Sequence, residues 1–271
     1  MVSTPLTWRV FQRPGSTLHY RFRPSHSGWV IVFLHGAGMD GRMFDAQLAA
    51  LPDGDGVVCW DARGHGRSTL EGPFRFDDMV ADLDALVTSI DAHRVILVGQ
   101  SMGGNLAQTY IDRHPERVAG LVLIDCTANH APLSRLDLLG LRSTRAVLTF
   151  YPWQLAVKQS ARACGRDPRT AAYAADCLRR IGKRRFVEVM DFWRKALRPD
   201  ATYRMPVPTL ALLGDKDRSG NIAKALPLLA ASDPSVQLVT IPDAAHNSNM
   251  DQPATTNRAL LSFLQGGRVP V

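Results

Sequence analysis

The sequence Val95-Ile96-Leu97-Val98-Gly99-Gln100-Ser101-Met102-Gly103 decides the fold of this chain of 271 residues. Its first four residues are β-branched or aliphatic, a pattern typical of a buried strand. The Gly-x-Ser-x-Gly that follows predicts a tight turn, and residues 102–114 have the pattern of a helix. A serine placed between strand and helix in this way forms a nucleophile elbow, in which the flanking glycines let both elements pack around a strained residue. Ser101 is therefore the predicted nucleophile.

Apolar runs alternate with helical patterns along the chain. The predicted strands are 6–13, 16–23, 29–34, 57–61, 94–99, 118–124, 208–213 and 236–241, and the predicted helices outside a long insertion are 42–51, 76–91, 102–114, 219–231 and 252–265. This alternation predicts an α/β fold with a mostly parallel sheet and helices on both faces.

Four further motifs, together with the one around Ser101, resemble the α/β-hydrolase family in kind and in order. They are residues 30–38 with His35-Gly36-Ala37-Gly38, residues 60–68 with Asp61-Ala62-Arg63-Gly64, residues 210–217 ending in Gly214-Asp215-Lys216-Asp217, and Ala244-Ala245-His246. The resemblance extends over nearly the whole chain. It implies an eight-stranded, mostly parallel α/β-hydrolase sheet with a helical cap inserted after the sixth strand.

About eighty residues separate the sixth and seventh predicted strands, which is too long for a plain loop in a compact domain. Helical patterns occupy 133–149, 153–164, 169–181 and 183–197 within this stretch. The resemblance identifies residues 127–205 as the cap, or lid, over the active-site mouth. Residues 1–126 and 206–271 are then the hydrolase core.

A serine nucleophile needs a general base within hydrogen-bond reach, and histidine suits this role near neutral pH. His246 follows the last predicted strand and is the expected base. A carboxylate must orient the imidazole, and Asp217 matches the family position for it. Asp215, two residues earlier, and Asp125, directly after the sixth strand, remain alternatives for the acid.

The oxyanion of a tetrahedral intermediate requires two N–H donors. The predicted donors are the backbone N–H groups of Met102, at the helix start, and of Ala37, in the loop after the third strand. Met39, Met43 and Phe44 follow that loop closely and are expected to line the substrate pocket. We expect neither a metal nor an organic cofactor, because the triad and the two amides supply all the chemistry.

The net charge of +7 is concentrated in one segment. Residues 127–205 carry sixteen Lys and Arg against six Asp and Glu, so the rest of the chain is slightly acidic. This distribution is typical of a solvated helical face, and no nucleic-acid partner is expected; a site for an anionic substrate remains the alternative. The sequence shows no secretion signal, no membrane span and no Cys-x-x-Cys pair, so a cytoplasmic location is expected.

The leading functional interpretation is a serine hydrolase that cleaves a small carboxylic ester, lactone or thioester through an acyl-enzyme. An acyltransferase or a cofactor-free perhydrolase of the haloperoxidase type would use the same triad with another acceptor. A ligand receptor or signalling protein on the same fold is a third interpretation. Since residue 101 is Ser rather than Asp, dehalogenase and epoxide hydrolase chemistry is not expected. The substrate and the oligomeric state are not predicted.

Overall fold

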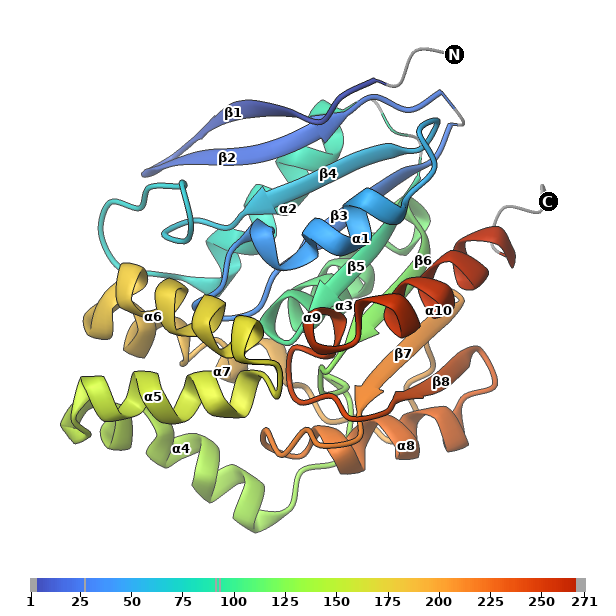
Figure 1. The fold of residues 1–271 in the computed structure, drawn as a ribbon. Helices are drawn as coiled ribbons and strands as arrows, with labels where there is room; N and C mark the ends of the chain where they lie inside the picture. The colour runs from blue at the N-terminus through green and yellow to red at the C-terminus, as the bar shows by residue number, and fades with distance from the viewer. Residues whose placement is uncertain (1–3, 27, 91, 93, 267–271) are drawn as a thin grey trace.

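The computed structural model describes residues 4–26, 28–90, 92 and 94–266. Eight strands form one sheet in the order β1-β2-β4-β3-β5-β6-β7-β8 (Figure 1). The strands are β1 (Thr7–Arg13), β2 (Ser16–Arg23), β3 (Val30–Leu34), β4 (Gly56–Asp61), β5 (Val95–Gln100), β6 (Val118–Ile124), β7 (Thr209–Gly214) and β8 (Val236–Ile241). Pairing from β4 through β8 is parallel, whereas β1 and β2 are antiparallel to their neighbours. The predicted fold class is confirmed.

The central strands are buried on both faces. Every residue of β3, β4 and β5 is buried, which explains their continuous apolar sequences. Alternate side chains enter two hydrophobic cores: Val32 and Leu34 belong to one, and Ile31 and Phe33 to the other. The sheet is therefore the middle layer of a three-layer structure.

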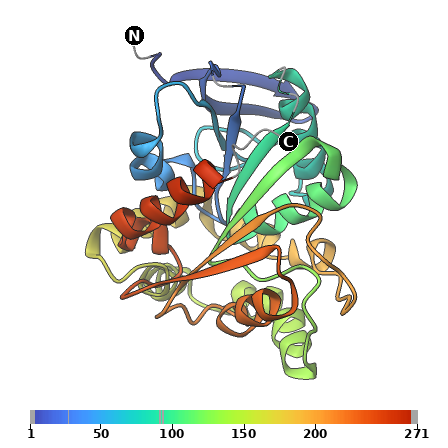
Figure 2. The same ribbon diagram turned by 90° about the vertical axis from the view of Figure 1, so that its right-hand side faces the viewer.

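Helices cover both faces of the sheet. One core contains α2 (Phe76–Ser89), α3 (Met102–Arg113) and α8 (Ile222–Ser232), and the other contains α1 (Asp45–Ala50) and α10 (Pro253–Gly266). Figure 2 shows α1 and α10 together on one side of the strands. Short helical segments complete this part: η1 (Gly41–Phe44), η2 (Pro115–Arg117) and α9 (Ser248–Asp251).

Four helices lie between β6 and β7, on the side toward which the parallel strands point (Figure 1). They are α4 (Arg135–Phe150), α5 (Trp153–Cys164), α6 (Pro168–Val189) and α7 (Trp193–Ala196). We call these four helices and their connections the cap. Gly182 interrupts α6 with a φ of 73°, where a break was predicted.

The predicted helix 183–197 is wrong in its second half. The helical chain ends at Val189, and only the four residues of α7 follow it. The N–H groups of Asp191 and Phe192 donate to carbonyls three residues earlier, which tightens the chain into a turn. Periodicity does not distinguish one helix from two separated by such a turn. No helix within the described ranges has the length and apolar character needed to cross a membrane.

Candidate active site

Ser101 lies at the sharp turn between β5 and α3. Its φ of 49° and ψ of −120° place it in a strained region that L-residues rarely adopt. The turn depends on the two glycines. A Cβ at Gly99 would lie 2.5 Å from the carbonyl oxygen of Gly103, and a Cβ at Gly103 would overlap the carbonyl oxygen of Leu34. The predicted elbow is thus present, and its glycines are required by close backbone packing.

Ser101, His246 and Asp217 form a chain of hydrogen bonds. Ser101 Oγ lies 3.0 Å from His246 Nε2, and His246 Nδ1 lies 3.0 Å from Asp217 Oδ2. The second Asp217 oxygen accepts the backbone N–H of Ser219 at 2.7 Å. With the proton on Nδ1, the imidazole donates to Asp217 and accepts from the serine hydroxyl. The three side chains, which follow β5, β7 and β8, therefore meet as the motifs predicted.

The electrostatics suit a histidine that gains and loses a proton. Burial lowers the pKa of His246, but the hydrogen bond to Asp217 and its negative charge outweigh burial and raise that pKa above its usual value. Burial raises the pKa of the Asp217 carboxyl, yet the interactions with His246 outweigh it and leave that pKa lowered. Asp217 therefore stays ionised beside the imidazole and favours its protonated form.

The two alternative acids have other partners. Asp215 pairs with Lys216 at 2.9 Å, and one of its oxygens accepts the N–H of Ala244 at 3.3 Å. Asp125 is fully buried, and its two oxygens accept the N–H groups of Gly214 at 2.7 Å and Ser248 at 2.9 Å. Asp125 thus ties the end of β6 to the segments that carry the acid and the histidine.

Burial is the largest cause that raises the pKa of Asp125 to about 7, and the charge of Asp217 adds to it. The His246 charge and the two backbone donors act in the opposite direction but do not cancel burial. The pKa of Asp125 is therefore raised, whereas that of Asp217 is lowered. The position of Asp125 at the end of a strand agrees with the other interpretation of this residue, a structural acid rather than the catalytic one.

The loop after β3 lies against the elbow. A Cβ at Gly36 would lie 3.2 Å from Ser101 Cβ and would collide with the side-chain oxygen of Gln100. Ala37, the next residue, lines the same cavity as Ser101. Met102 is the first residue of α3, so its N–H has no partner within the helix. The two predicted donors thus flank the serine.

Sequence reasoning missed the role of Gln100. Its side-chain Nε2 donates to the backbone carbonyl of His246 at 2.7 Å. This bond fixes the histidine loop against the strand that carries the serine. The residue occupies the variable position of Gly-x-Ser-x-Gly, and only the fold shows what it contacts.

A cavity of about 520 Å³ lies above Ser101 and His246. The core contributes Met39 and Asn105, Thr127 lies on the segment that leads from β6 into the cap, and the cap helices contribute mostly apolar side chains such as Leu141 and Trp193. No Lys or Arg is among its described lining residues, and Asp137 is their one carboxylate. The cationic side chains of the cap therefore point elsewhere.

Two of the three predicted pocket residues lie outside this cavity. Met39 lines it, but Met43 and Phe44 are buried in the hydrophobic core. The Phe44 ring packs against the Phe33 ring of β3, with 5.1 Å between the ring centroids. The reason is the tight η1 helix, which turns both side chains toward the sheet.

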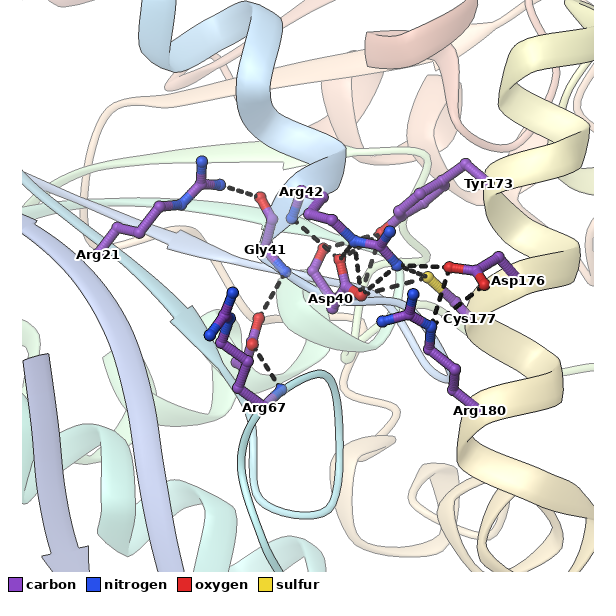
Figure 3. Close-up of polar contacts among 10 residues, drawn as sticks. Arg21, Asp40, Gly41, Arg42, Arg67, Tyr173, Asp176, Cys177 and Arg180 are labelled. Carbon is purple, nitrogen blue, oxygen red and sulfur yellow. Dashed lines mark hydrogen bonds and ion pairs between the residues drawn. The ribbon is translucent and has the colours of Figure 1, made fainter. Parts of the chain in front are cut away.

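A polar cluster joins the loop after β3 to α6 of the cap (Figure 3). The Tyr173 hydroxyl donates to the Asp40 carbonyl at 2.9 Å and accepts the Asp40 N–H at 3.1 Å. Arg42 donates to both oxygens of the Asp40 carboxylate and, at 2.9 Å, to Asp176. The Cys177 sulfur lies 3.4 Å from the same Asp40 carboxylate. The cap is thus held directly on the loop that carries Ala37.

Comparisons with known proteins find relatives along the sequence and in the fold. A putative non-heme haloperoxidase of Mycobacterium phage D29 is 36% identical over 104 residues, which are 38% of this chain and 37% of that protein. The sn-1-specific diacylglycerol lipase ABHD11 of Danio rerio is 26% identical over 264 residues, covering 87% of this chain and 78% of that protein. The crystal structure of a hydrolase from Pseudomonas aeruginosa superimposes with a TM-score of 0.79 at 25% identity, covering 95% of this chain and 98% of the other.

The sequence model of the alpha/beta hydrolase family matches residues 31–259, a range that begins in β3 and ends within α10. That range contains all three residues of the hydrogen-bonded chain and the whole cap. The chain therefore belongs to the alpha/beta hydrolase family.

Proposed function

We propose that the protein is a serine hydrolase that cleaves a carboxylic ester, lactone or thioester through an acyl-enzyme. The observation that carries this proposal is the hydrogen-bonded chain from Ser101 through His246 to Asp217 at the floor of a largely apolar cavity. The backbone N–H groups of Ala37 and Met102 supply the oxyanion hole.

The proposed reaction begins when Ser101 Oγ attacks the substrate carbonyl carbon while His246 Nε2 takes the hydroxyl proton. The negative charge that develops on the carbonyl oxygen is stabilised by the two amide donors. The imidazolium, supported by Asp217, then gives its proton to the leaving alcohol or thiol as the acyl–oxygen or acyl–sulfur bond breaks. Water repeats the sequence with His246 as base and releases the carboxylic acid.

The cavity favours a neutral, mainly apolar substrate. Its described lining carries no cation that would pair with a carboxylate or phosphate of the substrate. Asn105 of the core and Thr127, the first residue of the proposed cap, provide polar contacts. The proposed cap, residues 127–205, supplies most of the apolar wall, so its shape sets the chain length that fits. The free thiols Cys59, Cys126, Cys164 and Cys177 suit the proposed cytoplasmic location.

A cofactor-free perhydrolase is the second candidate, because the phage relative named as a putative non-heme haloperoxidase is 36% identical over 104 residues. Such an enzyme forms the same acyl-enzyme and transfers the acyl group to hydrogen peroxide in place of water. Product analysis with and without peroxide separates the two, because only a perhydrolase yields peracid from the ester.

The deciding experiment is a series of p-nitrophenyl esters of increasing acyl length, assayed with the wild-type protein and Ser101→Ala. We expect hydrolysis by the wild type and a loss of several orders of magnitude in the variant. A phosphonate directed at serine nucleophiles should label Ser101, as located by peptide mass mapping, and should leave Ser101→Ala unlabelled. Activity above about a tenth of wild type in the variant would refute the assignment.

A further inference from the structure

The cap exposes an unusual apolar stripe on α4. Leu136, Leu139, Val147 and Phe150 have exposed fractions of 79%, 64%, 55% and 86%. At 100° per residue these four positions fall within an arc of about 80° on one side of the helix. Leu155, at the start of α5, is 48% exposed and follows the stripe in the chain. Single exposed apolar residues are common on protein surfaces, but apolar residues grouped on one side of a helix often mark a binding surface.

The neighbouring side of the same helix lines the cavity. Asp137, Gly140, Leu141 and Thr144 are all in its lining, and so is Leu136 of the stripe. A capping box fixes the helix start, since the Ser134 side chain accepts the N–H of Asp137 and the Asp137 carboxylate accepts the N–H of Ser134. α4 is therefore a capped helix whose cavity side adjoins its solvent-exposed stripe at Leu136, at the outer edge of the molecule (Figures 1 and 2).

Positive charge borders the stripe. Arg135 and Arg142 lie beside it on α4, and neither has a carboxylate within 4.0 Å among the residues that the structure describes. Arg145, which is 63% exposed, reaches Asp191 only at 3.8 Å. The whole segment 127–205 carries sixteen Lys and Arg against six Asp and Glu. Two copies of this face would repel each other, whereas an anionic surface complements it.

We propose that the outer face of α4 docks on the surface of an anionic lipid bilayer. Its apolar side chains enter the headgroup–acyl boundary and its arginines pair with lipid phosphates, which is how amphipathic interfacial helices bind. The docked helix also forms part of the wall of the substrate cavity, so an apolar ester dissolved in the bilayer is brought to the cavity mouth. Only this delivery step rests on the proposed hydrolase function.

Flotation with vesicles of phosphatidylcholine alone, and of phosphatidylcholine mixed equally with phosphatidylglycerol, tests the docking without any turnover. The wild type should bind the mixed vesicles and lose binding at high salt. The double variant Leu139→Ser/Phe150→Ser should bind about tenfold more weakly or worse, because it removes the apolar anchors. Leu228→Ser, which replaces a 50% exposed leucine on α8, is the matched control and should bind like wild type.

Neither Leu139 nor Phe150 lines the cavity, so the double variant should hydrolyse a water-soluble short ester at the wild-type rate. Ser101→Ala should bind vesicles like wild type, which separates a failure of docking from a failure of the proposed chemistry. The inference is overturned if wild type and double variant bind alike, or if neither binds. It is overturned equally if the wild type is a dimer in solution that the double variant dissociates, because a second copy would then cover the stripe.

Discussion

Helices α3 and α4 both contribute residues to the active-site cavity, yet they are packed in opposite ways. Ten of the twelve residues of α3 are buried, while none of the sixteen residues of α4 is. α3 follows the elbow directly and packs between strands and helices of the core. α4 belongs to the cap, packs against α6 and exposes Leu139, Val147 and Phe150 to solvent. The buried helix α3 thus holds the Ser101 side of the cavity rigidly, whereas the exposed helix α4 forms part of the wall that limits which molecules enter.

The difference has an energetic meaning. Removing the hydrogen-bond partner of a buried polar group in the core lowers the free energy of unfolding, since water cannot replace that partner. Exposed groups of the cap are solvated and screened, so single changes there cost little. The expected effects of substitutions therefore decrease from the core outward.

Asp217→Asn should produce the largest effect of the acid substitutions. Loss of the carboxylate removes the support of the imidazolium and the preferred histidine tautomer, so kcat should fall by about 10⁴-fold. Asp215→Asn, its neighbour on the same turn, should change kcat little because its carboxylate faces Lys216. An equal loss in the two variants would show that the acid is misassigned.

The same substitution should shift the pH profile. His246 acts as base only when neutral, so kcat/KM should fall as the pH drops through its pKa. Asp217 raises that pKa, which places the acidic limb of the wild type above the ordinary histidine value. Residual activity of Asp217→Asn should have this limb at lower pH. A limb that stays in place would mean that Asp217 does not act on His246.

Asp125→Asn should mainly cost stability. An amide group can accept only one of the two backbone N–H bonds now made by the carboxylate, so one buried donor loses its partner, at about 1–3 kcal/mol. Urea unfolding should show this loss, and kcat should fall far less than in Asp217→Asn. Asp243→Asn is the control, since its side chain is 66% exposed and should leave stability unchanged. A larger loss of kcat than in Asp217→Asn would move the acid to β6.

Tyr173→Phe tests the contact between cap and core. It leaves the Asp40 N–H without the hydroxyl that accepts it, so the loop carrying Ala37 is held less firmly. With about 1–1.5 kcal/mol lost from one hydrogen bond, kcat should fall by about tenfold while KM stays similar. Tyr203→Phe, whose hydroxyl donates to Asp112 at 2.8 Å, is the control and should keep wild-type kcat. Equal kcat in both variants would show that the cap does not position this loop.

The smallest effect is expected from salt. A neutral ester and its analogue with a free carboxylate should respond alike, within about twofold, when salt reduces the screening length below about 10 Å. The reason is that the described cavity lining carries no cation. Steady-state kinetics at low and high salt measure this. A preference for the anionic ester that disappears with salt would show that the cap charges steer the substrate.

The strands were predicted within one or two residues of their ends because runs of Val, Ile and Leu bounded by Gly, Pro and Asp have few alternatives in an α/β chain. The positions of Ser101, Asp217 and His246 were predictable for a related reason. Each follows a strand, and parallel strands end at the same edge of the sheet. The chain itself thus brings these residues together.

Contacts between distant segments could not be predicted from the sequence. Tyr173 meets Asp40 across 133 residues, and no periodicity encodes such a pairing. Met43 and Phe44 were assigned to the pocket because they follow the loop closely in the sequence. Sequence proximity, however, does not reveal which way a side chain points. The exposed stripe of α4 was not predicted, since only the packing shows that its apolar side chains are exposed.

The hydrogen bond between Ser101 and His246 joins residues 145 positions apart. Ser101 follows β5, whereas His246 follows β8 at the far edge of the sheet, and β6 and β7 must pair between them before the two can meet. Closing such a long stretch of chain is entropically costly and therefore slow. During refolding, turnover should consequently return after compactness and helix content. The recovery of activity therefore indicates that the whole sheet has paired, and not only that the chain has become compact.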